Sequence, residues 1–203
     1  MTPSGPDITA LGPPPPDIAQ REPIIHDHRG PMARIRKSIH TTLRFGRAKY
    51  YRFDAPQSEF GTLYVADDLV GALLETRNQQ ASNHRPVISH QWLGERSLVT
   101  VTCQRPLHLI DISDSPGLLA IGADNRLSTG PRRVAQLWAR ALWNHLAQPD
   151  GIWYLARNAP RNTVAVLFED RCGPDVTLAA PISLAQHPEL PSSLNRLRIG
   201  LVP

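Results

Sequence analysis

Eight prolines fall within the first 31 residues, and four of them are consecutive, from Pro13 to Pro16. Proline lacks a backbone N–H donor and has a fixed φ, so this stretch resists both helix and sheet. We therefore expect residues 1–30 to form a disordered or loosely packed arm. Residues 31–203 have the size of one ordinary domain, and a hydrophobic content of 41% with 20% charged residues suits a globular core.

Several classes of protein are excluded by simple absences in the sequence. There is no run of 18 apolar residues and no basic segment followed by an apolar one at the N-terminus, so neither a membrane span nor a secretory signal is expected. The two cysteines, Cys103 and Cys172, are too few for a disulfide framework, and no zinc-type spacing occurs. The sequence thus predicts a cytoplasmic protein without a metal and with two reduced thiols.

The positive charge is concentrated in one segment. Between Met32 and Phe53 there are seven cations and no acid, and the chain carries a net charge of +4. Such a run is compatible with a solvated face, with nucleic-acid binding, or with binding of a pyrophosphate, which arginine holds well. Nucleic acid is the weakest of these alternatives because few aromatic residues are interleaved and no known binding module is present.

Strand and helix patterns alternate irregularly along the chain. Strands are expected at 62–66, 97–103, 106–112, 152–156, 163–168 and 197–202. Helices are expected after Asp67, which suits an N-cap, and from 128–131 toward Pro149, with Trp138 and His145 on the buried face. Because there is no regular βαβ alternation, the fold class is α+β. The absence of GxGxxG and Walker patterns argues against Rossmann and P-loop sites.

A series of short sequence segments says more about the family of this chain than its composition does. They are RFDAP at 52–56, FGTLYVAD at 60–67, ALLE at 72–75, QLWA at 136–139, DGIWYLAR at 150–157 and AVLFE at 165–169. In this order and spacing they resemble the RES domain, the toxin of RES–Xre toxin–antitoxin pairs. The resemblance is best over residues 34–169.

The resemblance implies a fold similar to the ADP-ribosyltransferase toxins, with a cleft that binds NAD⁺. It implies a toxin that depletes NAD⁺ by cleaving the nicotinamide–ribose bond, as a glycohydrolase or as a phosphorylase. The partner it implies is an Xre-like antitoxin, through which alone nucleic acid would be contacted, and a homo-oligomer is compatible with it. The family's functional positions correspond here to Arg52, Tyr64 and Glu75, and less distinctly to Arg34.

The chemistry of these side chains suits the implied reaction. Cleavage of an N-glycosidic bond develops positive charge on the ribose, which a carboxylate such as Glu75 stabilises. Guanidinium groups such as Arg52 and Arg34 hold a pyrophosphate bidentately. Tyr64 offers a flat ring for stacking and a hydroxyl for a ribose. Each residue also has an ordinary structural role available: Glu75 on a solvated helix face, Tyr64 in the core, and Arg52 in a salt bridge with Asp54 or Glu59.

One position departs from the family. Its serine is expected in a Tyr-x-Ser-Arg segment, but this chain has Ala156 there, followed by Arg157. A missing hydroxyl costs about 1 kcal/mol of binding to ribose or phosphate, which Arg157 could offset in part. The sequence therefore leaves two alternatives beside NAD⁺ cleavage: a catalytically impaired NAD⁺- or nucleotide-binding module, and an ADP-ribosyltransferase that acts on an acceptor.

Overall fold

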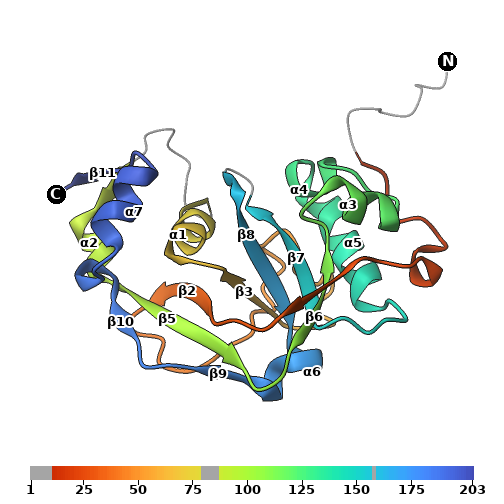
Figure 1. Ribbon diagram of the computed structural model, residues 1–203, viewed down its shortest axis with the longest axis horizontal. Helices are drawn as coiled ribbons and strands as arrows, with labels where there is room; N and C mark the ends of the chain where they lie inside the picture. Colours follow the sequence, from red (N-terminus) through yellow and green to blue (C-terminus); the bar gives the residue numbers. More distant parts are fainter. Residues whose placement is uncertain (1–10, 79–86, 157–158) are drawn as a thin grey trace, which may run out of the picture.

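The computed structural model describes residues 11–78, 87–156 and 159–203. Within these ranges one strongly curved sheet has nine strands, in the order β1-β6-β7-β8-β3-β2-β5-β10, with β9 also paired to β5 (Figure 1). Its strands are β1 (Ile25–His28), β2 (Met32–Lys37), β3 (Thr62–Ala66), β5 (Arg96–Cys103), β6 (Leu107–Asp111), β7 (Gly151–Ala156), β8 (Ala159–Phe168), β9 (Val176–Leu178) and β10 (Ile182–Ser183). A separate parallel pair joins β4 (Val87–Ser89) to β11 (Gly200–Val202).

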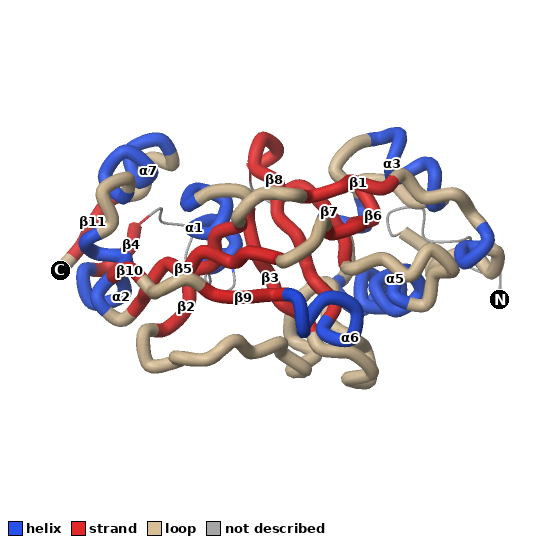
Figure 2. The backbone as a smooth tube through the Cα atoms, turned by 60° about the horizontal axis from the view of Figure 1, so that its bottom comes forward, coloured by secondary structure: helices blue, strands red, loops and turns tan. Residues whose placement is uncertain are grey.

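The helices lie mainly at the two ends of this sheet, as Figure 2 shows. They are α1 (Leu69–Asn78), α2 (His90–Gly94), α3 (Ser115–Ile121), α4 (Arg126–Thr129), α5 (Arg132–Trp143), α6 (Glu169–Cys172) and α7 (Leu190–Arg196), with short 3₁₀ turns at Ile18–Gln20, Gly173–Asp175 and Leu184–Gln186. α3, α4 and α5 cover one end, while α2 and α7 cover the other, and α1 packs across β2, β3 and β8 (Figure 1). The mixture confirms the α+β class. Of the described residues, none form a helix long and apolar enough to cross a membrane.

Most of the expected strands occur close to their predicted bounds. The helix after β3 is capped by Asp68 rather than by Asp67, since the Gly71 amide donates to Asp68 Oδ1 over 2.7 Å. Asp67 instead accepts a hydrogen bond from the Thr163 hydroxyl on the neighbouring β8. The last strand is shorter than expected, because the turn that ends α7 continues to Ile199, whose amide donates to the Leu194 carbonyl over 2.9 Å, and β11 begins only at Gly200.

Alternating residues of the strands contribute to two apolar clusters, one on each face of the sheet. Ile152, Tyr154 and Ala156 of β7 belong to the larger cluster, together with residues of α1 and α5. Trp153, between them in the sequence, belongs to the smaller cluster on the other face. Trp138 and His145 are 1% and 3% exposed, which confirms that they are core residues.

The proline-rich arm is packed against the domain from Leu11 onward. Leu11 and Ile18 are buried in the larger cluster, and β1 pairs antiparallel with β6. The Trp138 indole donates to the Gly12 carbonyl, and His145 Nε2 lies 3.0 Å from the Arg21 carbonyl. Residues 11–30 are thus more ordered than expected, because prolines hinder helix and sheet without preventing apolar side chains and free carbonyls from packing. Residues 1–10 lie outside the described residues.

Candidate active site

A buried carboxylate organises the turn that precedes β3. Asp54 is 2% exposed, and its Oδ2 accepts hydrogen bonds from the amides of Tyr50 and Tyr51 over 2.9 and 2.8 Å. Its Oδ1 accepts from the hydroxyls of Thr62 and Tyr64 over 2.7 and 3.1 Å. Four donors on one carboxylate stabilise its buried charge and fix the turn against the strand.

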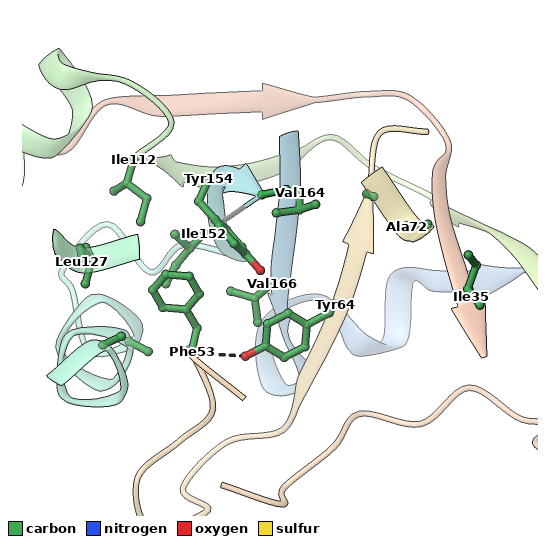
Figure 3. Packing of buried hydrophobic residues seen from close by; sticks show 14 of the residues in the cluster. Ile35, Phe53, Tyr64, Ala72, Ile112, Leu127, Ile152, Tyr154, Val164 and Val166 are labelled. Atoms are coloured by element: carbon green, nitrogen blue, oxygen red, sulfur yellow. Dashed lines mark hydrogen bonds between the residues drawn. The ribbon is translucent and has the colours of Figure 1, made fainter. Parts of the chain in front are cut away.

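The hydroxyl of Tyr64 is occupied within the protein. It donates to Asp54 and accepts from the amide of Phe53 over 2.9 Å, a contact that is visible in Figure 3. Burial raises the pKa of this phenol well above its ordinary value, so it stays protonated. Only the ring of Tyr64 is therefore left to contact a ligand, and the Tyr51 ring lies at an angle to it with the centroids 5.4 Å apart.

Three of the predicted residues meet in one small cavity of about 50 Å³. Arg34 reaches it from β2, Tyr64 from β3 and Glu75 from α1, and Tyr51 completes the wall. The fold brings them together because β2 and β3 are neighbours in the sheet and α1 packs across both strands. Residues 11 to 41 positions apart in the sequence thus line one cavity.

Glu75 is the group in this cavity whose pKa is moved into the neutral range. Burial raises its pKa from 4.5 to about 7, and the positive charge of Arg52 partly opposes that rise. Near neutral pH both the carboxylate and the carboxylic acid are populated. A carboxyl group that exchanges its proton near neutral pH and borders a cavity is typical of a catalytic residue.

Arg52 connects the turn to the helical end of the molecule. Its Nη1 donates to the carbonyls of Gly130 and Leu127 over 2.9 and 3.3 Å, at the junction of α4 and α5. Its positive charge also lowers the pKa of Glu75 and of Tyr154, in opposition to the effect of burial on both groups. The two acids considered from sequence as salt-bridge partners of Arg52 contact other groups. Asp54 accepts the four hydrogen bonds described above, and Glu59 forms an ion pair with Arg140 over 3.5 Å.

A larger cavity of about 360 Å³ adjoins the first and shares Arg34, Tyr51 and Tyr64 with it. Arg36 and Arg44 also line this second cavity, whose size is in the range of ligand pockets. Arg34 Nη1 donates to the Tyr64 carbonyl over 2.6 Å, which holds the guanidinium between the two cavities. Part of the cationic run therefore lines a pocket instead of forming an open face, which favours a small anionic ligand over a nucleic-acid backbone.

The individual roles of Arg36 and Arg44 were not predicted; the only sequence signal for them was the run of cations. Two further residues were missed. Gln136 of α5 donates to the carbonyls of Lys49 and Tyr51, both over 3.0 Å, and so supports the turn. Tyr154 of β7 is the other, and the charges of Glu75 and Arg52 act on its hydroxyl.

Ala156 ends β7, where the pairing with β8 shifts register. Its methyl group is 2% exposed, on the same side of the sheet as Tyr154. Arg157, which was predicted to contribute to the site, lies outside the described residues. In the ranges that the structure describes, no group of three or more histidine, cysteine, aspartate or glutamate side chains could hold a metal ion.

The comparisons with known proteins agree with this architecture. The crystal structure of the M. tuberculosis MbcT–MbcA toxin–antitoxin complex contains a chain that superposes with a TM-score of 0.63 at 18% identity, over 91% of this chain and 98% of that one. At that identity the likeness shows the fold alone. No curated protein matches the sequence. The sequence profile described as the RES domain matches residues 31–192, four-fifths of the 203 residues, and the chain therefore belongs to the RES domain family.

Proposed function

We propose that this protein is an NAD⁺-cleaving enzyme, the toxin component of a toxin–antitoxin pair. The observation that carries the proposal is the half-buried carboxylate of Glu75 in a cavity that it shares with Arg34 and Tyr64. Membership of the RES family and the fold shared with a chain of a toxin–antitoxin complex support it.

In the reaction the bond between nicotinamide N1 and ribose C1′ breaks, and its electron pair leaves with neutral nicotinamide. The ribose acquires oxocarbenium character, and ionised Glu75 stabilises that positive charge. Water or inorganic phosphate then attacks C1′, giving ADP-ribose or its 1-phosphate. The leaving group needs no strong acid, so positioning and electrostatics supply most of the acceleration.

The remaining residues hold the dinucleotide. Arg34, with Arg36 and Arg44 in the adjoining cavity, provides the positive charge that a pyrophosphate requires. Arg52 supports both Glu75 and the substrate's phosphates, and the ring of Tyr64 stacks on a base or on nicotinamide. The catalytic unit is residues 31–203, with residues 11–30 packed against it.

The test is NAD⁺ turnover by the purified full chain, with and without phosphate. Release of nicotinamide is expected, and it should fall at least 100-fold in Glu75→Gln, since a single stabilising group in a transition state is worth about that much. Glu189→Gln, which changes an exposed glutamate outside these cavities, is the matched control. Intact NAD⁺ after incubation with folded wild-type protein would refute the proposal, whereas dependence on phosphate would identify phosphorolysis.

A second candidate function is favoured by Ala156, which lacks the family's hydroxyl. A catalytically impaired module would bind NAD⁺, giving heat in calorimetry, without releasing nicotinamide. Transfer of ADP-ribose to a protein acceptor would instead give labelled protein from labelled NAD⁺. An Xre-like antitoxin is the proposed partner and the cytoplasm the proposed location, where NAD⁺ is abundant; co-expression with a neighbouring helix-turn-helix protein should relieve growth arrest.

A further inference from the structure

Tyr154 is a buried side chain that the proposed mechanism does not use. It lies on β7, is 4% exposed, and packs its ring against Phe53 with the centroids 4.7 Å apart at 70°. Figure 3 shows its hydroxyl directed past Val166 toward the side of the sheet where Tyr64 lies. The ring is therefore fixed by the core, and the hydroxyl is held at the end of a rigid side chain.

Charged groups of the candidate site act electrostatically on this hydroxyl. Glu75 and Asp54 raise the pKa of Tyr154 while Arg52 lowers it, and burial, the largest effect, raises it well above the ordinary value. Tyr154 also acts electrostatically on Tyr64. At any working pH the phenol is protonated, and it can donate a hydrogen bond.

Among the described residues the Tyr154 hydroxyl has no hydrogen-bond partner. β3, which carries Tyr64, and β7, which carries Tyr154, both pair with β8. The Tyr64 hydroxyl has two hydrogen-bond partners, Asp54 and the amide of Phe53. In the described part of the chain the buried side-chain atoms that lack a partner are Arg36 Nε and Arg171 Nε, so the Tyr154 oxygen keeps contact with solvent, and a ligand can take the place of water there. The Tyr64 hydroxyl is therefore occupied within the protein, whereas the Tyr154 hydroxyl is not.

The position of Tyr154 relative to Ala156 gives the hydroxyl a specific role. Residues two apart on a strand point to the same face and are about 6.7 Å apart, a span that a tyrosine side chain can cover. Both belong to the same cluster, on the face of the sheet that carries the candidate site. We propose that the Tyr154 hydroxyl donates a hydrogen bond to a ribose oxygen of NAD⁺, replacing the hydroxyl that Ala156 lacks; this rests on the proposed function above.

The experiment compares four full-length proteins: wild type, Tyr154→Phe, Ala156→Ser and the double variant. Tyr154→Phe should lower kcat/KM for NAD⁺ about 10-fold or more, the effect of one hydrogen bond in the site. Its Tm should stay the same or rise, because the removed hydroxyl has no protein partner. The Ala156→Ser change should restore most of the lost activity in the double variant. Tyr50→Phe, at a tyrosine 52% exposed, is the matched control and should leave turnover unchanged.

The outcomes separate this inference from the proposed function. If wild type cleaves NAD⁺ and Tyr154→Phe does so equally well, the role of Tyr154 is refuted and the function stands. A Tm that falls together with activity would indicate a structural role instead, and a double variant as slow as Tyr154→Phe would refute the replacement of one hydroxyl by the other. If wild type binds NAD⁺ without cleaving it, the same variants are compared by Kd, and equal values refute the inference. A wild type that neither binds nor cleaves NAD⁺ refutes both.

Discussion

The hydroxyl of Tyr64 donates a 3.1 Å hydrogen bond to Oδ1 of Asp54. This contact joins the strand that forms one wall of the site to the turn that carries Arg52. It also means that the tyrosine expected to bind a ribose through its hydroxyl contributes chiefly its ring. The site is therefore built on a buried carboxylate that belongs to the framework, and Glu75, the proposed catalytic carboxylate, lies on a separate helix.

Replacing Asp54 should destabilise the protein strongly. Asp54→Ala leaves four donors without their acceptor, and the loss of a buried charged hydrogen-bond network costs about 3–5 kcal/mol. Urea denaturation of the purified variants measures this free energy of unfolding. Asp67→Ala, which removes an exposed aspartate bonded only to Thr163 among the contacts described, should cost less than about 1 kcal/mol. Equal effects at the two positions would contradict the framework role of Asp54.

Replacing Glu75 should make the protein more stable at high pH. The folded-state pKa of about 7 lies above the ordinary 4.5, so the contribution of Glu75 to stability is complete below pH 4.5 and is lost as the pH rises through 7. Glu75→Gln removes that loss, worth at most about 3 kcal/mol. Its Tm should exceed that of wild type at pH 8 and match it at pH 4.5. If Glu75→Gln were less stable than wild type at pH 8, the ionised Glu75 carboxylate would not be destabilised by its partial burial, and the raised pKa would be refuted.

The activity of wild type should rise with pH up to about 7 and then level off, because the ionised form of Glu75 is the one that stabilises a cationic ribose. The nicotinamide ring of bound NAD⁺ is positively charged and lowers the pKa of a nearby carboxyl. The rise of kcat should accordingly lie at lower pH than that of kcat/KM. Initial rates of nicotinamide release between pH 5 and pH 9 measure both, and activity that falls over this range would assign Glu75 to the protonated role.

Removing the charge of Arg52 should move that profile. Arg52 lowers the pKa of Glu75, so Arg52→Met should shift the rise of kcat/KM to higher pH while also weakening substrate binding. Arg133→Met, at an exposed arginine in the first turn of α5, is the matched control and should leave the profile in place. If the pH profile of Arg52→Met matched that of wild type, the charge of Arg52 would not affect the pKa of Glu75.

The N-terminal segment should contribute to stability. Removing residues 1–21 deletes Leu11 and Ile18 from the core and takes away the carbonyls that Trp138 and His145 contact. The free energy of unfolding should fall by about 3–6 kcal/mol, because two buried apolar side chains are removed. Thermal unfolding measures it as a lower Tm, by about 2–4 °C for each kcal/mol. Gln20→Ala, at an exposed position in the same segment, should leave the Tm unchanged.

The sequence by itself determined the local elements and the identity of the family. The strand at 62–66 and the helix that carries Glu75 follow from local patterning, since apolar runs and turn residues act on their immediate neighbours. The short segments around Arg52, Tyr64 and Glu75 were sufficient for the RES assignment, which the match over residues 31–192 confirms. Their roles in NAD⁺ cleavage stay predictions.

Only the tertiary structure decided which polar groups already have hydrogen-bond partners within the protein. The hydroxyl of Tyr64 donates a hydrogen bond to Asp54, whereas the hydroxyl of Tyr154 has no partner among the described residues. In the sequence both tyrosines lie in similar apolar strands. The packing of the proline-rich segment and the raised pKa of Glu75 likewise depend on distant partners. Hydrogen bonding and desolvation are set by three-dimensional neighbours, and a local sequence pattern carries little information about them.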